Sequence, residues 1–391
     1  MIVGQLVEST GIGGAENLAV QIANALAARG HRSWVYVLDR PGLLEKKLSP
    51  DVGLHHFHYR RDSILNPFKF TVSVSRGFRM LRRRLRADGV EVLQCHLPTP
   101  NMWGLAMAAS GTCRVIATIH NNREFSYGSD KSMRGSLRHV VYRQVVRRCD
   151  AVVAVSEQVR QSFLKELGLT AEQAPRLVAV ANGVPIPPPP SPAERQAVRA
   201  RQGVGEGEAL LLGVGRLCEQ KNFGDLVAAA AHLREAGVPF RAVVAGDGPL
   251  RGDLEADIAQ GGLQDTVTLL GAVDDVTPLL QAADMLVMPS LWEGLPLALL
   301  EAMACGLPVV GYAIDGLSDV VEDGRHGLLV PKGDTAALAA ACRRLVEDPE
   351  LRERLGRSGR ELVEQRFGFD RTIEQLLELY EGRRPGSGAH R

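Results

Sequence analysis

The stretch Ala283–Gly306, ADMLVMPSLWEGLPLALLEAMACG, contains the pattern of a strand, a loop and a helix in direct succession. Its first part, Ala283–Ser290, is a short apolar run that predicts a buried strand. Gly294 leaves room for a ligand to approach the backbone. Pro296 suits the first helical turn, where a missing N–H is harmless. The stretch therefore predicts a strand that leads into a helix, which is the repeating unit of a parallel sheet.

Two carboxylates flank the start of this predicted helix. Glu293 precedes it, and Glu301 lies inside it, eight positions later. The unpaired N–H groups of the first helical turn form an anion site. A helix start that can hold a phosphate, between carboxylates that can bind sugar hydroxyls, predicts a site for a nucleotide sugar.

Apolar runs alternate with helical patterns along the rest of the chain, which predicts an α/β protein with parallel sheets. The strands expected in the first half are Ile2–Val7, Ser33–Leu38, Val90–Cys95, Arg114–Ile119, Ala151–Val155 and Leu177–Ala181. Those expected in the second half are Ala209–Val214, Phe240–Ala245, Val267–Leu270, Met285–Met288, Pro308–Tyr312 and Leu328–Val330. The proline-rich run Pro185–Pro192 between them predicts a stiff linker.

The pattern predicts two doubly wound, Rossmann-like domains that face a central cleft, with ligands at the carboxyl ends of the strands. We expect an N-terminal domain over residues 1–184 and a linker over 185–200. We expect a nucleotide-sugar domain over 201–365, a helix over 366–382 and a disordered tail over 383–391.

Composition narrows the class of protein. The 391 residues include six cysteines and no Cys-x-x-Cys pair, which argues against a zinc site or disulfide framework and favours a reducing cytosol. No apolar run reaches the roughly 20 residues that cross a bilayer. The first residues show no basic region followed by an apolar core, so no signal peptide is expected.

Charge is unevenly distributed along the chain. Residues 1–150 hold 22 Lys and Arg against 11 Asp and Glu, whereas the remainder carries a net charge of −10. This excess predicts an anionic partner, such as a membrane surface, a phosphorylated lipid or nucleic acid. Part of it comes from Arg76, Arg79, Arg82, Arg83, Arg84 and Arg86, with Phe78, Leu81 and Leu85 between them, and part from Arg134, Arg138, Arg143, Arg147 and Arg148. The first cluster fits an interfacial helix or a core-packing helix with a solvated basic side.

A glycine-rich loop, Ser9–Glu16, follows the first expected strand. Gly13 and Gly14 permit close approach to a diphosphate or a sugar. With Asp39 at the end of the second strand, the loop also suggests a dinucleotide site. The third glycine of that fingerprint would fall at Glu16, which makes an NAD-dependent dehydrogenase less favoured.

Two cations follow the strand Ala209–Val214. Arg216 can bind two oxygens of a diphosphate, and Lys221 adds a point charge. Together they can stabilise a nucleoside diphosphate as it leaves with growing negative charge. The chain contains no Asp-x-Asp, so we expect no metal and no other cofactor. Gly246, after a later strand, can approach the nucleotide.

The block Ala283–Gly306 resembles the donor-site signature of the retaining glycosyltransferases of family 4, which have the GT-B fold. The loop Gly13–Glu16 and the segment Gly215–Lys221 are similar to the family's Gly-Gly and Gly-Arg…Lys motifs. The resemblance extends from about Gly13 to Gly333. It implies that the domain over residues 1–184 binds the acceptor and that the helix over 366–382 crosses back to that domain. The loop Asp315–Asp319 departs from the family's Gly-Gly-x-Pro-Glu, which leaves the choice of donor open.

The resemblance implies a role for each motif residue. Arg216 and Lys221 would hold the diphosphate, and Glu301 the ribose hydroxyls. Glu293, with the backbone of Gly294 and Leu295, would bind hydroxyls of the transferred sugar. The glycine loop would meet the donor phosphates and sugar, His120 would touch the donor sugar, and the backbone of Val273 would meet the nucleobase.

These observations predict a retaining glycosyltransferase that uses a UDP-sugar in preference to a GDP-sugar. The expected acceptor is a glycan or a polyprenyl-diphosphate-linked glycan, as in lipopolysaccharide or exopolysaccharide assembly, and no nucleic acid is expected. The expected location is the cytoplasm, with a peripheral position on the inner face of the membrane. The alternatives are a GT-B nucleotide-sugar epimerase, an NAD-dependent dehydrogenase and a catalytically silent partner of a polysaccharide complex.

Overall fold

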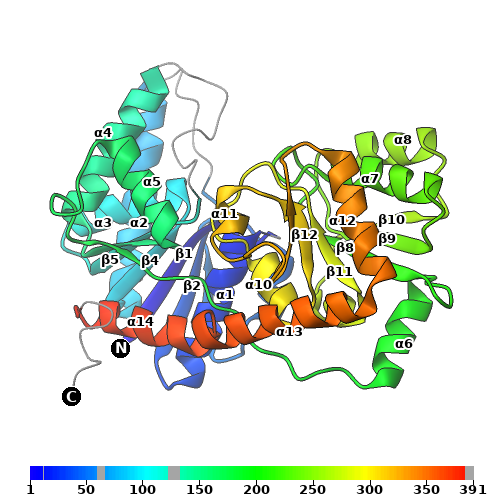
Figure 1. Cartoon of the computed structure of the whole chain (residues 1–391). Coiled ribbons are helices and arrows are strands. Elements are labelled where there is room, and N and C mark those ends of the chain that lie inside the picture. Colours follow the sequence, from blue (N-terminus) through cyan, green and yellow to red (C-terminus); the bar gives the residue numbers. More distant parts are fainter. Residues whose placement is uncertain (12, 60–66, 122–132, 384–391) are drawn as a thin grey trace. The chain divides into compact units, whose positions relative to one another are not determined.

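A computed structural model describes residues 1–11, 13–59, 67–121 and 133–383. The chain divides into two compact units (Figure 1): unit 1 is Met1–Asn182 with Thr372–Arg391, and unit 2 is Gly183–Arg371. Within the described residues each unit contains one sheet of parallel strands, with helices packed on it. The α/β class and the two Rossmann-like domains expected from the alternating pattern are confirmed.

The sheet of unit 1 has seven strands in the order β3-β2-β1-β4-β5-β6-β7. They are β1 (Ile2–Ser9), β2 (Arg32–Arg40), β3 (Val52–His56), β4 (Val92–His96), β5 (Arg114–Ile119), β6 (Ala151–Ala154) and β7 (Leu177–Ala179). The helical segments are α1 (Gly14–Ala28), η1 (Leu43–Lys47), α2 (Pro67–Asp88), α3 (Pro98–Ala109), α4 (Met133–Arg148), α5 (Glu157–Leu167) and most of α14 (Phe369–Tyr380).

The sheet of unit 2 has six strands in the order β10-β9-β8-β11-β12-β13. They are β8 (Ala209–Val214), β9 (Phe240–Ala245), β10 (Val267–Gly271), β11 (Met285–Met288), β12 (Val309–Tyr312) and β13 (Gly327–Val330). The helices are α6 (Pro192–Arg201), α7 (Phe223–Glu235), α8 (Arg251–Gln260), α9 (Thr277–Ala282), α10 (Leu297–Ala304), α11 (Asp315–Ser318), α12 (Thr335–Glu347) and α13 (Pro349–Arg366).

In both sheets the chain winds outward from a central strand and then returns to its other side. The neighbours at this reversal are β1 and β4 in unit 1, and β8 and β11 in unit 2. Loops that follow two such strands leave the sheet in opposite directions and open a crevice at the carboxyl edge. The strand order therefore marks one ligand-binding position in each unit.

Every strand expected from the sequence is present, and the ends differ by about two residues at most. The edge strand β3 was not expected. Its sequence, VGLHH, lacks the apolar run that identifies a buried strand, and its pairing with β2 from Ser33 and Val52 to Val37 and His56 holds it in the sheet. An edge strand needs fewer apolar residues because it has a neighbour on only one side.

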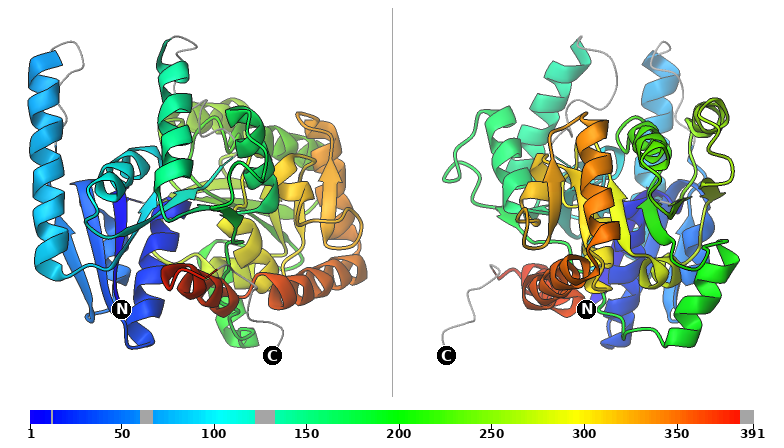
Figure 2. Two further views of the ribbon diagram at one scale, coloured as in Figure 1. Left: turned by 90° about the vertical axis from the view of Figure 1, so that its left-hand side faces the viewer. Right: turned by 45° about the vertical axis from the view of Figure 1, so that its right-hand side comes forward.

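The arginine-rich helix α2 packs on unit 1 through the apolar side that the sequence predicts. Leu81 and Leu85 are fully buried, and a Cβ at Gly77 would lie 2.5 Å from the Trp103 ring. In Figure 2 the helix runs beside the strands of its own unit and extends beyond them. The expectation of an interfacial helix inserted through this side is wrong for Leu81 and Leu85, because the protein core already covers them.

The segment expected as a linker over residues 185–200 is only partly a linker. Helix α6 begins at Pro192, where Ser191 accepts from the Glu194 N–H and the Glu194 carboxylate accepts from the Ser191 N–H. Such a capping box is a strong start signal for a helix. The prolines before Ser191 obscured it in the sequence, because they suggested an extended segment.

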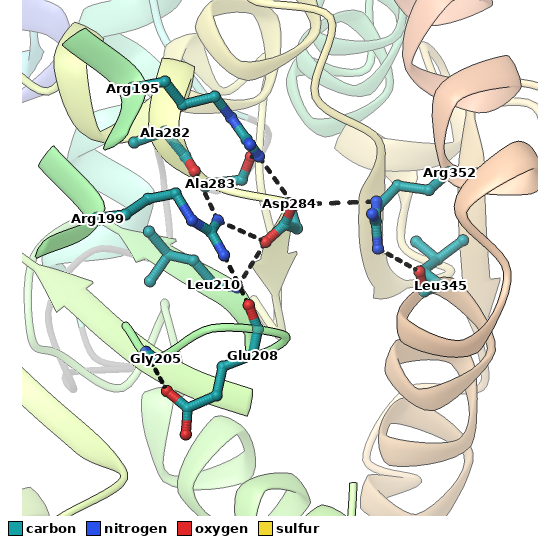
Figure 3. Close-up of polar contacts among 10 residues, drawn as sticks. All are labelled: Arg195, Arg199, Gly205, Glu208, Leu210, Ala282, Ala283, Asp284, Leu345 and Arg352. Atoms are coloured by element: carbon teal, nitrogen blue, oxygen red, sulfur yellow. Dashed lines mark hydrogen bonds and ion pairs between the residues drawn. The ribbon is translucent and has the colours of Figure 1, made fainter. Parts of the chain in front are cut away.

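Within unit 2, helix α6 is held against the strands by the buried carboxylate of Asp284 (Figure 3). Arg195 and Arg199 donate to it at 2.9 and 2.8 Å, and Arg352 of α13 lies 4.0 Å away. The Leu210 N–H donates to the same carboxylate at 2.7 Å. Asp284 precedes β11 and Leu210 is the second residue of β8, so this cluster sits at the amino edge of the sheet, opposite the predicted ligand position.

The C-terminal helix α14 contributes Tyr380 to the core of unit 1. Its side chain is 1% exposed, and Arg114 donates to the carbonyls of Tyr380 and Leu379 at 2.7 and 3.3 Å. Through such contacts the segment from Thr372 onward belongs to unit 1. The expected disordered tail, from residue 384 onward, lies outside the described residues.

No helix in the described part of the chain is long and apolar enough to cross a membrane.

Candidate functional site

Both cations and one of the two carboxylates expected to bind the donor lie in loops that follow the two strands at the reversal of the second sheet. Arg216 and Lys221 come after β8, and Glu293 comes after β11. Hydrogen bonds from Leu291 N–H to the Gln220 carbonyl, 2.8 Å, and from Gln220 Nε2 to the Trp292 carbonyl, 3.0 Å, join the two loops. The structure thus brings together residues that are about 70 positions apart in the sequence.

Lys221 and Glu293 form a buried ion pair, which the sequence did not predict. Lys221 Nζ donates to Glu293 Oε1 at 2.6 Å, and the side chains are 17% and 6% exposed. Gln220 Nε2 approaches the second carboxylate oxygen at 3.3 Å. A buried carboxylate of this kind needs a charged partner. Glu293 therefore holds the lysine in place, and its Oε2 keeps capacity to accept from a ligand hydroxyl.

Arg216 differs from Lys221 in that its side chain is exposed and forms no ion pair within the described part of the chain. A guanidinium in this state has all its donors available for an anion.

Glycines form the floor beside these cations, at the carboxyl ends of β8 and β9. A Cβ at Gly246 would lie 1.8 Å from the Gly215 carbonyl oxygen, and one at Gly248 would lie 2.4 Å from the Leu217 carbonyl oxygen. Gly215 and Gly246 both have φ of 151°, outside the range that side chains favour. Gly246 is thus required for close packing of the two strand ends, and its place beside Arg216 keeps it in the candidate donor site.

The helix after Glu293 starts one residue later than expected. α10 begins at Leu297, and Pro296 is its N-cap, with extended φ and ψ of −74° and 123°. Proline at this position supplies no side-chain cap, so the first N–H groups of α10 keep their capacity for an anion. Gly294 and Leu295 are buried in the loop before it, and Glu301 lies half-buried in the helix.

The loop that departs from the family pattern lies against Glu293. A Cβ at Gly316 would be 2.6 Å from the Glu293 Cβ, so the short helix α11 packs directly on the Glu293 backbone. Burial, together with the nearby Asp315, raises the pKa of Asp319 to about 6. The residues that distinguish this chain from the family pattern therefore adjoin the candidate sugar site.

Val273 lies in the loop after β10, at the same edge of the sheet, and is half-buried. A role of its backbone near the nucleobase stays a prediction.

In unit 1 the glycine loop begins α1, as the sequence predicts. Gly13 is the N-cap and the exposed Gly14 is the first helical residue, while Ile12 lies outside the described residues. A Cβ at Gly13 would meet the Glu16 carboxylate at 2.2 Å. A carboxylate beside this loop disfavours a phosphate through like charge and favours hydroxyl groups. This geometry also argues against a dinucleotide pyrophosphate at the loop.

A cavity of about 1420 Å³ opens at the carboxyl edge of the first sheet. Its wall combines charged residues with aromatic and apolar side chains. They are Glu8, Leu38, Asp39, Arg40, Pro41, His58, Tyr59, Val74, Ser75, Phe78, Arg79, Thr99, Met102, Trp103 and Ala106. Asp39, the residue considered for a dinucleotide ribose, lies in this wall and pairs with Arg40 at 3.1 Å. Phe78 of α2 also lines the cavity, which gives it a role inside unit 1.

His120 follows β5 and is half-buried. Its Nε2 lies 3.1 Å from Nδ1 of His96, the last residue of β4. Burial lowers the pKa of His120 to about 4, so the ring is neutral near pH 7. His96 was not predicted as a functional residue. The signal available was the alternation Gln94-x-His96 and Thr118-x-His120 in strands that are otherwise apolar.

Metal-binding groups are absent from the residues the structure describes: no three His, Cys, Asp or Glu side chains are close enough to hold an ion. The six cysteines are all unpaired. Ser156 caps α5 by accepting from the Val159 N–H at 3.1 Å.

Comparisons with known proteins agree with this arrangement. Residues 194–362 match the family model described as Glycosyl transferases group 1, and residues 12–186 match Glycosyltransferase Family 4. The 2-deoxystreptamine glucosyltransferase of Streptomyces kanamyceticus is 32% identical over 315 residues, which cover 77% of this chain and 79% of that protein. The phosphatidyl-myo-inositol mannosyltransferase of Mycobacterium leprae is 30% identical over 383 residues, 94% of this chain and 93% of that protein.

The fold is similar to that of HepE from Anabaena, solved with UDP and glucose. The TM-score is 0.82 at 21% identity, and the match covers 97% of this chain and 99% of that one. This similarity confirms the GT-B fold, and the relatives favour a glycosyltransferase over the epimerase, dehydrogenase and silent-partner alternatives. The chain belongs to the group 1 glycosyltransferases of family 4, and it is an enzyme.

Proposed function

We propose that unit 2 binds a UDP-sugar and that the enzyme transfers its sugar with retention of anomeric configuration. The observation that carries the proposal is the Lys221–Glu293 pair, 2.6 Å long, beside the exposed Arg216 at the reversal of the second sheet. It supplies two cations for a diphosphate and a carboxylate for hydroxyl groups in one place. The structure of HepE with UDP supports UDP as the nucleotide, since that protein shares the fold.

Each residue has a specific part in the proposed mechanism. Arg216 and Lys221 neutralise the charge that develops on the diphosphate as its bond to the sugar C1 breaks. Glu293 orients the sugar by accepting a hydroxyl hydrogen bond, and Glu301 accepts from the ribose. Two cations and the start of α10 serve in place of a metal ion.

Retention follows if the acceptor attacks from the side that the diphosphate leaves. The acceptor oxygen bonds to C1 as the C1–phosphate oxygen bond breaks, and the acceptor proton passes to the departing diphosphate. The Lys221 contact supports this route, because a carboxylate held by a lysine is a weaker nucleophile for double displacement than a free one.

The cavity in unit 1 is the proposed acceptor site. Its volume of about 1420 Å³ exceeds the usual range of small-ligand pockets, roughly 300–1000 Å³. Trp103, Tyr59 and Phe78 offer apolar surface, while Glu8 and Arg79 offer polar contacts. This mixture fits a lipid-linked or surface glycan, with both sugar and apolar parts.

A second candidate acceptor is a soluble aminocyclitol. It is favoured by the 32% identity to the 2-deoxystreptamine glucosyltransferase, and Glu8 and Asp39 in the cavity wall could bind ammonium groups.

A thermal-shift panel with UDP, GDP, ADP and NAD tests the donor proposal. UDP should raise the melting temperature most, and hydrolysis of UDP-glucose, UDP-galactose and UDP-N-acetylglucosamine should then identify the sugar. Arg216→Ala should lose the UDP shift, whereas Arg343→Ala, an exposed arginine of α12, should keep it. A larger shift with NAD or GDP, or complete and reversible loss of hydrolysis in EDTA, contradicts the proposal.

A further inference from the structure

A row of buried polar side chains crosses the sheet of unit 1. Gln5 of β1 is paired in register with Gln94 of β4, and His96 of β4 with Thr118 of β5. Residues that are paired in register, or two apart on one strand, point to the same side of a sheet. All four side chains are 0 or 1% exposed. The row ends at His120, two residues after Thr118.

Hydrogen bonds connect this row to the C-terminal helix. The Tyr380 hydroxyl of α14 donates to Gln94 Oε1 and accepts from Gln5 Nε2 at 3.5 Å. Gln5 Oε1 lies 2.8 Å from His96 Nε2, and His96 Nδ1 lies 3.1 Å from His120 Nε2. A continuous chain of polar atoms therefore runs from Tyr380 through Gln5 and His96 to His120.

Burial determines the protonation states of the titratable groups in this hydrogen-bonded row. It holds the pKa of His96 well below its ordinary value, helped by the neighbouring His120, and lowers that of His120 to about 4. Burial also raises the pKa of Tyr380 above its ordinary value. Near pH 7 the tyrosine keeps its proton and each imidazole carries one.

The partners then determine where each proton lies. Tyr380 has one proton and gives it to Gln94, so its oxygen accepts from the Gln5 amide. Gln5 Oε1 consequently accepts from His96 Nε2–H. His96 Nδ1 has only a lone pair, so His120 Nε2 must carry the proton that it accepts. The opposite tautomer of either histidine would leave a buried acceptor without a donor.

We propose that Tyr380, Gln5 and His96 are positioning residues that fix His120 as the Nε2–H tautomer. Its free Nδ1 is then an acceptor and takes a hydrogen bond from a substrate hydroxyl. This role rests on the proposed glycosyl transfer, for which the family resemblance implies that His120 touches the donor sugar. In this arrangement the last turn of α14 determines which ring nitrogen of His120, the residue after β5, carries the proton.

Nitrogen NMR of protein labelled with ¹⁵N-histidine tests the tautomer directly and needs no substrate. Resonances of His96 and His120 are assigned by their loss in His96→Asn and His120→Ala. Both rings should carry the proton on Nε2 between pH 6.5 and 8. A proton on Nδ1 of His120, or a doubly protonated ring in this range, overturns the proposal.

Kinetics test the link to α14. Tyr380→Phe removes only the hydroxyl and should lower kcat for UDP-glucose hydrolysis about tenfold, the size expected from one hydrogen bond, with an unchanged UDP thermal shift. It should also give mixed tautomers in the NMR spectrum. Tyr36→Phe is the control, because it removes the hydroxyl of another buried tyrosine of unit 1, one that donates to Asp88 at 2.7 Å. Its kcat should not change.

A double-variant cycle separates positioning from general destabilisation. Tyr380→Phe combined with His120→Ala should be no slower than His120→Ala alone, because the hydrogen bonds from Tyr380 affect turnover only through that histidine. Losses that multiply would contradict the proposal. A wild-type protein without a UDP shift would instead contradict the proposed donor, and the NMR result would still decide the tautomer.

Discussion

Two buried carboxylates of unit 2 lie at opposite edges of one sheet and have different surroundings. Asp284, at the amino edge, receives Arg195, Arg199, the Leu210 N–H and, at 4.0 Å, Arg352 (Figure 3). Glu293, at the carboxyl edge, receives one lysine and a long contact from Gln220. They are 8% and 6% exposed, so burial does not distinguish them.

The number of donors around each carboxylate does distinguish them. At Asp284 both carboxylate oxygens already accept from donors of the protein, and these contacts join helices α6 and α13 to the strands. Glu293 keeps an oxygen with spare capacity, and the exposed Arg216 lies in the loop that carries its lysine. A fully satisfied buried charge stabilises a fold, whereas a partly satisfied one at a sheet's carboxyl edge is ready for a ligand.

The largest effect is expected from Asp284→Ala. It leaves two arginines facing a site without a carboxylate, and breaking a buried pair in this way costs about 3–5 kcal/mol. Calorimetry should show a melting temperature lower by about 10 °C for the transition of unit 2. The UDP affinity of the folded protein should be unchanged at low temperature. A normal melting temperature would mean that this cluster does not hold α6 and α13.

The cations at the other edge should affect turnover more than stability. Arg216→Ala should lower kcat about 10²- to 10³-fold, as expected when one preorganised donor to a developing anion is removed. Its melting temperature should stay within about 1 °C of wild type, because Arg216 forms no ion pair within the described residues. Lys221→Ala should show a similar kinetic loss together with lower stability, since it leaves Glu293 buried and unpaired. Equal stability of the two variants would show that the Lys221–Glu293 pair has no structural part.

Glu301 should affect binding of the nucleotide rather than the chemical step. Glu301→Ala removes an acceptor for the ribose, and a hydrogen bond to a charged group contributes roughly 1.5–3 kcal/mol. Calorimetric titration with UDP should show affinity weaker by about 10- to 100-fold. Glu301→Gln, which keeps one acceptor oxygen, should lie between Ala and wild type. An unchanged UDP affinity of the Ala variant would reject the ribose role.

Acid should weaken the Asp284 cluster at the amino edge of the sheet. Burial alone would raise the pKa of Asp284, but the Leu210 N–H, Arg199 and Arg195 outweigh it and hold the pKa below the ordinary value. A carboxyl with a lowered pKa stabilises the fold above its unfolded pKa of about 3.9, and this stabilisation is lost as the pH falls through the folded pKa. Wild-type unit 2 should therefore lose stability below about pH 4. Asp284→Asn should start less stable and show a shallower loss in that range.

The smallest effect per residue is expected from the exposed arginines of α2. If unit 1 meets an anionic bilayer, each should contribute roughly 1 kcal/mol, and salt should weaken the attraction. Flotation with phosphatidylserine vesicles compares wild type with a variant in which Arg76, Arg83 and Arg86 are serine. The control changes three exposed arginines of unit 2, Arg343, Arg344 and Arg354. Wild type and control should float at low salt, whereas the α2 variant should remain in solution. Equal behaviour of all three would favour a soluble acceptor.

Several properties of this enzyme follow from sequence alone because they depend on local patterns. Alternating apolar runs determine the strands of both sheets, and Glu293, Gly294 and Glu301 lie around a strand–loop–helix unit that short-range preferences specify. The edge strand β3 was missed because four of its five residues are only half-buried and it pairs with β2 alone. The start of α6 was missed because adjacent prolines outweighed its capping box.

Only the tertiary structure decided which of these residues meet. The Lys221–Glu293 pair requires β8 and β11 to be neighbours, and the chain from Tyr380 to His120 requires α14 to lie against β1 and β4. The sequence shows which side chains carry charge or a hydrogen-bond donor, but it does not give the strand order. Strand order decides whether a buried polar group finds its partner in the protein or keeps capacity for a ligand.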